Sequence, residues 1–172
     1  MTTDGELNVH AYNDLVGRFN EETDRAAGVL ACAYLDAYLE DLLREMWTKG
    51  KRTEELFQGQ GALGSLSSKI GIVYALGIVD DHAARDLDLI RKVRNHFAHD
   101  IRNATFDTSP VADWCSEIRV IDVCVEDTEK RSSRERYLLG IALLTGMIST
   151  SAKVPVGFME RMTGVRRVAL TD

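Results

Sequence analysis

Residues 80–100 read DDHAARDLDLIRKVRNHFAHD, and this stretch decides the fold class. Five of its positions are spaced by four, three, four and three residues, namely Ala83, Leu87, Ile90, Arg94 and Phe97. Such spacing places side chains on one face of an α-helix. The stretch therefore predicts an amphipathic helix that begins at Asp80 or Asp81 and ends near Ala98, with one arginine on its apolar face.

Helical spacing recurs on both sides of this stretch and predicts further helices. They are expected at residues 10–22, 24–47, 65–76, 110–121 and 132–153. Thr23 is expected to cap the helix at 24–47, and Ser132 with Glu135 has the spacing of a capping box. Ser109 is expected to cap the helix that Pro110 starts. No segment alternates convincingly as a strand, so the expected fold is all-α, an up-and-down bundle of about six helices.

Length and composition fit a single globular domain. The chain has 172 residues, of which 45% are hydrophobic and 28% charged, and its formal net charge is -6. The domain is expected at residues 10–154, between a loose N-terminal arm at 1–9 and a tail at 155–172. The acidic balance argues against a broad DNA-binding surface. No signal peptide and no uncharged stretch of ~18 residues is visible, so a cytoplasmic protein without a membrane span is expected.

Neither a metal ion nor a cofactor is expected. The cysteines Cys32, Cys115 and Cys124 lack metal-ligand spacing and are predicted to be reduced thiols. Residues 59–64 spell the glycine pattern of dinucleotide-binding loops, but no strand precedes them. His96 and His99 are three residues apart, and no cysteine or histidine cluster supplies further ligands.

Arg94 stands out on the apolar face, because desolvating an unpaired guanidinium is costly. It needs a carboxylate, a backbone acceptor or a bound anion. The helix at 24–47 offers Asp36 and Glu40 on a partly apolar face, and Lys69 is a second possible partner for these carboxylates. A structural ion-pair network of Asp36, Glu40, Lys69 and Arg94 is therefore predicted as one interpretation.

His99 follows Arg94 by five residues. If the helix ends near Ala98, the imidazole can turn back toward Arg94. A histidine near a helix C-terminus is also favourable through the helix dipole, and for His99 taken alone that explanation is preferred.

Arg94, Asn95, three further residues and His99, at the end of a helix, resemble the signature of HEPN domains. HEPN domains are small helical bundles, often homodimers, and many resemble metal-independent ribonucleases. The resemblance implies that His99 is the catalytic base, Arg94 the clamp on the scissile phosphate and Asn95 a polar orienter. The chemistry is consistent, because an imidazole with a pKa of ~6.5 can take the proton of a ribose 2′-hydroxyl. An arginine can also hold the charge that develops on the phosphate.

A longer series of sequence blocks resembles the mannitol-repressor family. The blocks are TDRAA at 23–27, LDAYLE at 35–40, GALGSLSSKI at 61–70, VYALGIV at 73–79, DLDLIRKVRNHFAH at 86–99 and FD at 106–107. Together they cover roughly residues 20–115. Members of this family are associated with repression of mannitol uptake and use, and they lack an obvious DNA-reading module. The resemblance therefore implies a role through protein partners.

Two functions remain open from the sequence. The first is a regulatory or interaction protein of the mannitol-repressor type, which represses transcription or sugar-uptake functions through a protein partner. The alternative is a metal-independent HEPN ribonuclease, a toxin or defence effector that acts on RNA with Arg94 and His99, with an antitoxin as its partner. The net charge of -6 favours the first function, because RNA would meet an acidic chain. A homodimer is expected under either function.

Overall fold

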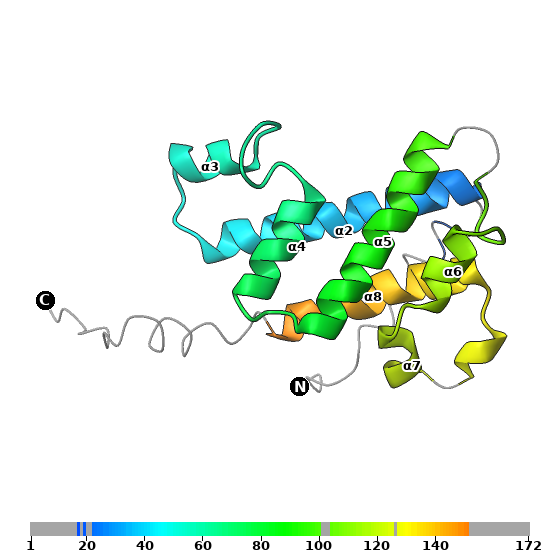
Figure 1. Cartoon of the computed structure of the whole chain (residues 1–172). Helices are drawn as coiled ribbons and strands as arrows, with labels where there is room; N and C mark the ends of the chain where they lie inside the picture. Colours follow the sequence, from blue (N-terminus) through cyan, green and yellow to red (C-terminus); the bar gives the residue numbers. More distant parts are fainter. Residues whose placement is uncertain (1–16, 18, 20–21, 101–103, 126, 152–172) are drawn as a thin grey trace, which may run out of the picture.

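The computed structural model describes residues 17, 19, 22–100, 104–125 and 127–151 (Figure 1). These residues form α-helices and one short 3-10 helix, with no strand among them. The expected all-α fold is confirmed. The predicted arm at 1–9, nearly all of the predicted helix at 10–22 and the predicted tail at 155–172 lie outside the described residues.

The described helices are α2 (Asp24–Met46), α3 (Lys51–Phe57), α4 (Leu66–Ala75), α5 (Asp81–His99), α6 (Val111–Ser116), α7 (Val120–Cys124), the 3-10 helix η1 (Thr128–Lys130) and α8 (Ser133–Ser151). Four of the helices, α2, α4, α5 and α8, begin and end close to the predicted positions. The Thr23 side chain accepts a hydrogen bond from the N–H of Ala26, as predicted. The capping box before α8 is also confirmed, because the Ser132 N–H donates to Glu135 and the Glu135 N–H donates to the Ser132 hydroxyl.

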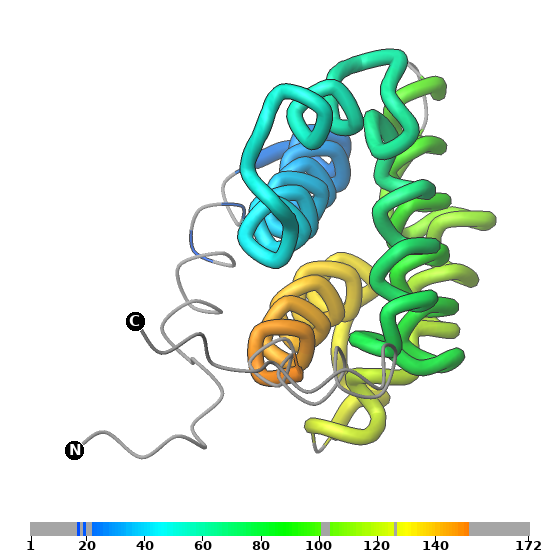
Figure 2. The backbone as a smooth tube through the Cα atoms, turned by 90° about the vertical axis from the view of Figure 1, so that its left-hand side faces the viewer, coloured from blue at the N-terminus to red at the C-terminus, as the bar shows by residue number. Residues whose placement is uncertain are grey.

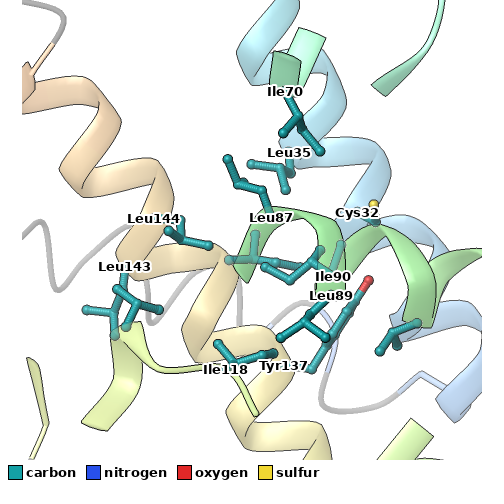
Figure 3. Packing of buried hydrophobic residues seen from close by; sticks show 14 of the residues in the cluster. Cys32, Leu35, Ile70, Leu87, Leu89, Ile90, Ile118, Tyr137, Leu143 and Leu144 are labelled. Atoms are coloured by element: carbon teal, nitrogen blue, oxygen red, sulfur yellow. The ribbon is translucent and has the colours of Figure 1, made fainter. Parts of the chain in front are cut away.

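Three long helices, α2, α5 and α8, surround the core. Figure 2 shows α2 and α8 on one side of the bundle and α4 with α5 on the other. α2 and α8 run in the same direction, and Arg134 near the start of α8 pairs with Asp24 at the start of α2 at 2.8 Å. Leu35, Ile90 and Tyr137, one residue from each long helix, are fully buried in the centre (Figure 3). Burial of this apolar surface is the main source of stability.

α2 and α5 approach each other closely at Gly28. A Cβ atom at this position would lie 2.3 Å from Cδ2 of Phe97 on α5. The Phe97 ring is fully buried and packs against Phe106, with ring centroids 4.8 Å apart. The Tyr137 hydroxyl of α8 donates to the Gly28 carbonyl at 2.7 Å. Only glycine allows this approach of three helices.

The predicted helix at 110–121 is instead divided into α6 and α7. Arg136 of α8 donates to three carbonyl oxygens at the break, those of Cys115, Ser116 and Ile118. Asp86 of α5 accepts from the N–H groups of Arg119 and Val120 at 3.0 and 2.7 Å. These two buried side chains form hydrogen bonds with backbone N–H and C=O groups that would pair with one another in a continuous helix. The prediction of one helix was therefore wrong. Residues 116–120 contain no glycine or proline, so the sequence carries no local signal for the break.

The predicted cap at Ser109 was also wrong. Pro110 stands just before α6, and no side chain caps this helix. The Ser109 hydroxyl donates to the Asp113 carboxylate at 2.6 Å instead of accepting from the backbone.

Candidate functional site

Lys69 of α4 is a buried cation held by two carboxylates of α2. Its ammonium group donates to Asp36 Oδ1 at 2.9 Å and to Glu40 Oε2 at 2.8 Å, and the residue is only 2% exposed. Burial disfavours the charge, but the hydrogen bonds to Glu40 and Asp36 outweigh it and raise the pKa of Lys69. The structure thus brings three members of the predicted ion-pair network together.

The network continues to α3 through Arg44. This side chain donates to Glu40 Oε1 at 3.0 Å, pairs with Glu54, and lies over the Phe57 ring at 4.3 Å from its centroid. The charged groups therefore fasten α2, α3 and α4 to one another. Their arrangement is that of a structural element, because each charge has a fixed partner.

Replacing Lys69 by methionine should lower the free energy of unfolding by about 1–3 kcal/mol at pH 7, since two neighbouring carboxylates lose their counter-charge. Burial alone would raise the pKa of Glu40, but the hydrogen bonds from Lys69 and Arg44 outweigh it and lower that pKa. Stability from a carboxylate with a lowered folded-state pKa is present above its unfolded pKa and is lost as the pH falls through the folded pKa. The deficit of the variant in urea unfolding should therefore shrink as the pH falls below about 4.5.

The control for this substitution is Lys51→Met on α3. The Lys51 side chain is 91% exposed and lies 3.9 Å from Glu55, so its removal should leave the unfolding midpoint unchanged. A deficit of the Lys69 variant that stays constant from pH 7 to acid would contradict the assigned role of Glu40.

Arg94 does not lie on the buried face of α5. The residue is exposed, and its Nη1 donates to Asn95 Oδ1 at 3.0 Å. The expectation of apolar surroundings was wrong, because the face of α5 that packs on the core is centred on Ile90, Val93 and Phe97. Arg94 falls at the edge of this face, from which a long side chain reaches water. Within the described ranges it forms no ion pair, so it is not part of the Lys69 network.

The bond between Arg94 and Asn95 is the contact that joins members of the predicted catalytic set. His99 is the last residue of α5 and is exposed, and Asn95 is half-buried. His96 lies beside an acidic group, with its Nε2 3.8 Å from Asp100 Oδ2. The catalytic roles of Arg94, Asn95 and His99 remain a prediction.

A shallow groove follows the exposed side of α5. It encloses about 420 Å³ and is lined by Tyr74, Asp81, Ala84, Arg85, Asp88, Leu89, Arg91, Lys92 and Glu117. Arg85 pairs with Glu117, and Arg91 pairs with Asp88 at 3.0 Å. Sequence reasoning missed this groove, because its lining comes from α4, α5 and the residue after α6. The available signal was the run of charged residues on the solvent side of α5.

Tyr74 of α4 forms the aromatic wall of this groove. Its side chain is 48% exposed, and the Asp81 carboxylate beside it raises the pKa of its hydroxyl. Lys92 also lines the groove and, within the part of the chain that the structure describes, has no carboxylate partner. The groove therefore offers an aromatic ring, fixed ion pairs and one free cation to a bound molecule.

A family model described as mannitol repressor matches residues 14–144 of the chain. The chain belongs to the mannitol repressor family. The resemblance seen in the sequence blocks is thereby confirmed, whereas the resemblance to HEPN domains stays a prediction. No curated protein matches the chain.

Two solved structures share the fold of this mannitol repressor family member. One is described as the X-ray structure of the MtlR–HPr complex from Escherichia coli, with a TM-score of 0.65 and 21% identity, covering 80% of this chain and 98% of that chain. The other is described as a possible transcriptional regulator, YggD, from Shigella flexneri 2a, with a TM-score of 0.56 and 14% identity, covering 83% of this chain and 96% of that chain. At these identities the likeness shows the fold alone.

Among the residues that the structure places, no group of three histidine, cysteine or acidic side chains could hold a metal ion. No helix in the same ranges has the length and apolar character needed to cross a bilayer. Cys32 and Cys115 are buried, and burial raises the pKa of both thiols to about 12, so neither is a nucleophile at neutral pH.

Proposed function

We propose that this chain is a regulatory protein that acts by binding a protein partner rather than by catalysis. The observation that carries the proposal is the match of residues 14–144 to the mannitol repressor family, supported by a fold shared with a chain whose structure is described as a complex with HPr. A regulator of this kind needs a surface that fits its partner. It represses transcription or sugar-uptake functions through that partner, without a DNA-reading element of its own.

The groove over α5 is the surface we propose for the partner. Tyrosine and arginine are enriched among residues that carry most of the binding energy in protein interfaces. Tyr74 and Arg91 provide these side chains, and Lys92 adds a charge that can select the partner. The ion pairs of Arg85 and Arg91 hold the surrounding side chains in place before binding.

The remaining parts of the proposal come from the sequence. We propose that the bundle is of the HEPN type, that the chain forms a homodimer and that it works in the cytoplasm. No observation favours the ribonuclease alternative, because the Arg94 guanidinium is bonded to Asn95 and both Arg94 and His99 are exposed on α5.

The purified chain should bind the HPr of its own host with a dissociation constant of about 10 μM or tighter, measured by isothermal titration calorimetry. Tyr74→Ala and Lys92→Glu should each weaken this binding by about 10-fold or more, since each removes a central contact of the groove. Lys51→Glu on the distant α3 makes the same charge change at a side chain that is 91% exposed, and it should bind like the wild type.

Three outcomes separate the parts of this proposal. Absence of HPr binding by the wild type would contradict the HPr partner. Binding that Tyr74→Ala and Lys92→Glu leave unchanged would contradict the groove alone. Metal-independent cleavage of RNA, abolished in His99→Ala with the fold intact, would reverse the preference for a regulator over a ribonuclease.

A further inference from the structure

Residues 48–65 connect α2 to α4 and include α3, and we call this segment the α3 strap. Figure 1 shows α3 apart from α5 and α8. Phe57 and Leu63 are the buried residues of the α3 strap, whereas most of its other residues are exposed, including Leu56 at 37%. Little apolar surface therefore holds the α3 strap on the bundle. Few buried apolar contacts are typical of segments that open while the rest of a protein stays folded.

Close backbone contacts join the two halves of the α3 strap. The N–H of Leu63 in the loop donates to the Leu56 carbonyl of α3 at 2.8 Å. Gly61 lies so near α3 that a Cβ atom there would be 2.3 Å from the Glu55 carbonyl oxygen. α3 itself has seven residues, and no side chain caps its start. A helix this short is not stable in water without packing. Once detached, α3 and its loop should therefore unfold together.

Arg44 of α2 attaches the α3 strap to the bundle by charge. Its Nη1 pairs with Glu54 of α3, and its guanidinium carbon lies 4.3 Å from the centroid of the Phe57 ring. The Arg44 side chain is 27% exposed and that of Glu54 is 56% exposed. Salt weakens the attraction between charges that water reaches, whereas apolar packing is not screened in this way. The attachment of the α3 strap should therefore depend on ionic strength.

Arg44 keeps another partner when the α3 strap detaches. It is also bonded to Glu40 Oε1 at 3.0 Å, and Glu40 Oε2 accepts from Lys69 at 2.8 Å. These bonds join α2 to itself and to α4, so they do not involve the strap. Water can replace Glu54 on the guanidinium, whereas uncovering an apolar contact costs free energy in proportion to its area. Detaching the α3 strap should therefore cost less than separating α2, α5 and α8, whose contacts are apolar.

We infer that the α3 strap is a conformational device that opens as one unit while the rest of the bundle stays folded, with Arg44 as a latch that salt releases. In the closed state Phe57 and Leu63 are buried, and in the open state both are exposed. The free energy of this local opening lies below that of global unfolding. The groove on α5 contains no residue of the α3 strap, so the inference is independent of the HPr proposal.

Hydrogen–deuterium exchange of the full chain without a partner tests this inference. At low salt the backbone amides of residues 54–57 and of Leu63 should exchange about 100-fold faster, or more, than those of residues 87–93 in α5. Raising the sodium chloride concentration from about 0.05 M to about 0.5 M should speed exchange in the α3 strap by about 3-fold, because the latch is screened. The same change should leave the exchange of α5 unaltered.

Arg44→Met removes the latch. This variant should exchange the amides of the α3 strap about 10-fold faster than the wild type and should lose most of the salt dependence, since the charge is gone. Arg52→Met is the matched control. Arg52 on α3 is exposed and forms no ion pair among the described residues, so this variant should exchange like the wild type.

Rates in the α3 strap are compared with those of α5 in the same variant, so a general loss of stability does not imitate local opening. Strap amides that exchange as slowly as those of α5 would overturn the opening of the α3 strap. Fast exchange that neither salt nor Arg44→Met changes would overturn the role of Arg44 as its latch. Neither result bears on HPr binding.

Discussion

Replacing Arg136 by leucine is expected to lower the free energy of unfolding by about 3–5 kcal/mol. The residue is 9% exposed, and its guanidinium bonds with a set of oxygens around the break between α6 and α7. They are the carbonyl oxygens of Cys115, Ser116, Ile118 and Thr128, and Asp122 Oδ1, at 3.0 to 3.4 Å. Leucine fills part of the space but donates nothing, so buried carbonyl groups lose their partners at about 1–3 kcal/mol each.

Urea unfolding followed by circular dichroism measures this loss. Arg119→Leu is the control, because the Arg119 side chain is exposed and the residue contributes its backbone N–H to Asp86. The control should unfold at the wild-type urea concentration. A wild-type midpoint for Arg136→Leu would show that the segment 115–122 holds its shape without the guanidinium.

Gly28→Ala should destabilise the chain by about 2 kcal/mol, although alanine favours a helix by roughly 1 kcal/mol over glycine. The added methyl group would lie 2.3 Å from Cδ2 and 2.8 Å from Cε2 of Phe97. Phe97 cannot move away freely, because its ring is fully buried against Phe106. The two helices must separate, and the hydrogen bond from Tyr137 to the Gly28 carbonyl is strained with them.

Gly71→Ala should change the stability of the chain in the opposite direction from Gly28→Ala. Gly71 lies within α4, and a Cβ there would meet no atom within 4 Å. Helix propensity alone should then act and stabilise the chain by up to about 1 kcal/mol. Thermal melts of the two variants should move in opposite directions from the wild type. A Gly28→Ala melt at or above the wild-type temperature would contradict the close packing of α2 on α5.

Local sequence signals predicted the helices well where the helix ends are set locally. Thr23 caps α2, and the Ser132–Glu135 pair caps α8, because each partner lies within one helical turn. The break after α6 was not predictable in this way. It depends on Arg136 and Asp86, which reach it from two other helices and leave no local mark.

The site was harder to predict than the fold, since several cations could have satisfied the same carboxylates. Asp36 and Glu40 both accept hydrogen bonds from Lys69, which is the cation that packing brings to them. Arg94 was placed on the buried face because its spacing from Ile90 and Phe97 fits a helical stripe. The same rule applied to Asp86 would have found a carboxyl group that is 1% exposed, four residues before Ile90. The spacing of apolar residues shows that α5 has a buried face, but the helices that pack against α5 determine which residues lie at the centre of that face.

Hydrogen–deuterium exchange of the chain with and without HPr tests partner docking over α5 most directly. With HPr bound, the backbone amides of residues 84–92 and of Tyr74 should exchange more slowly than in the free chain, because Tyr74 and the exposed side of this part of α5 line the groove. Unchanged exchange in these segments, in a sample where HPr is shown to be bound, would contradict docking in the groove. Protection confined to another face would place the partner there instead.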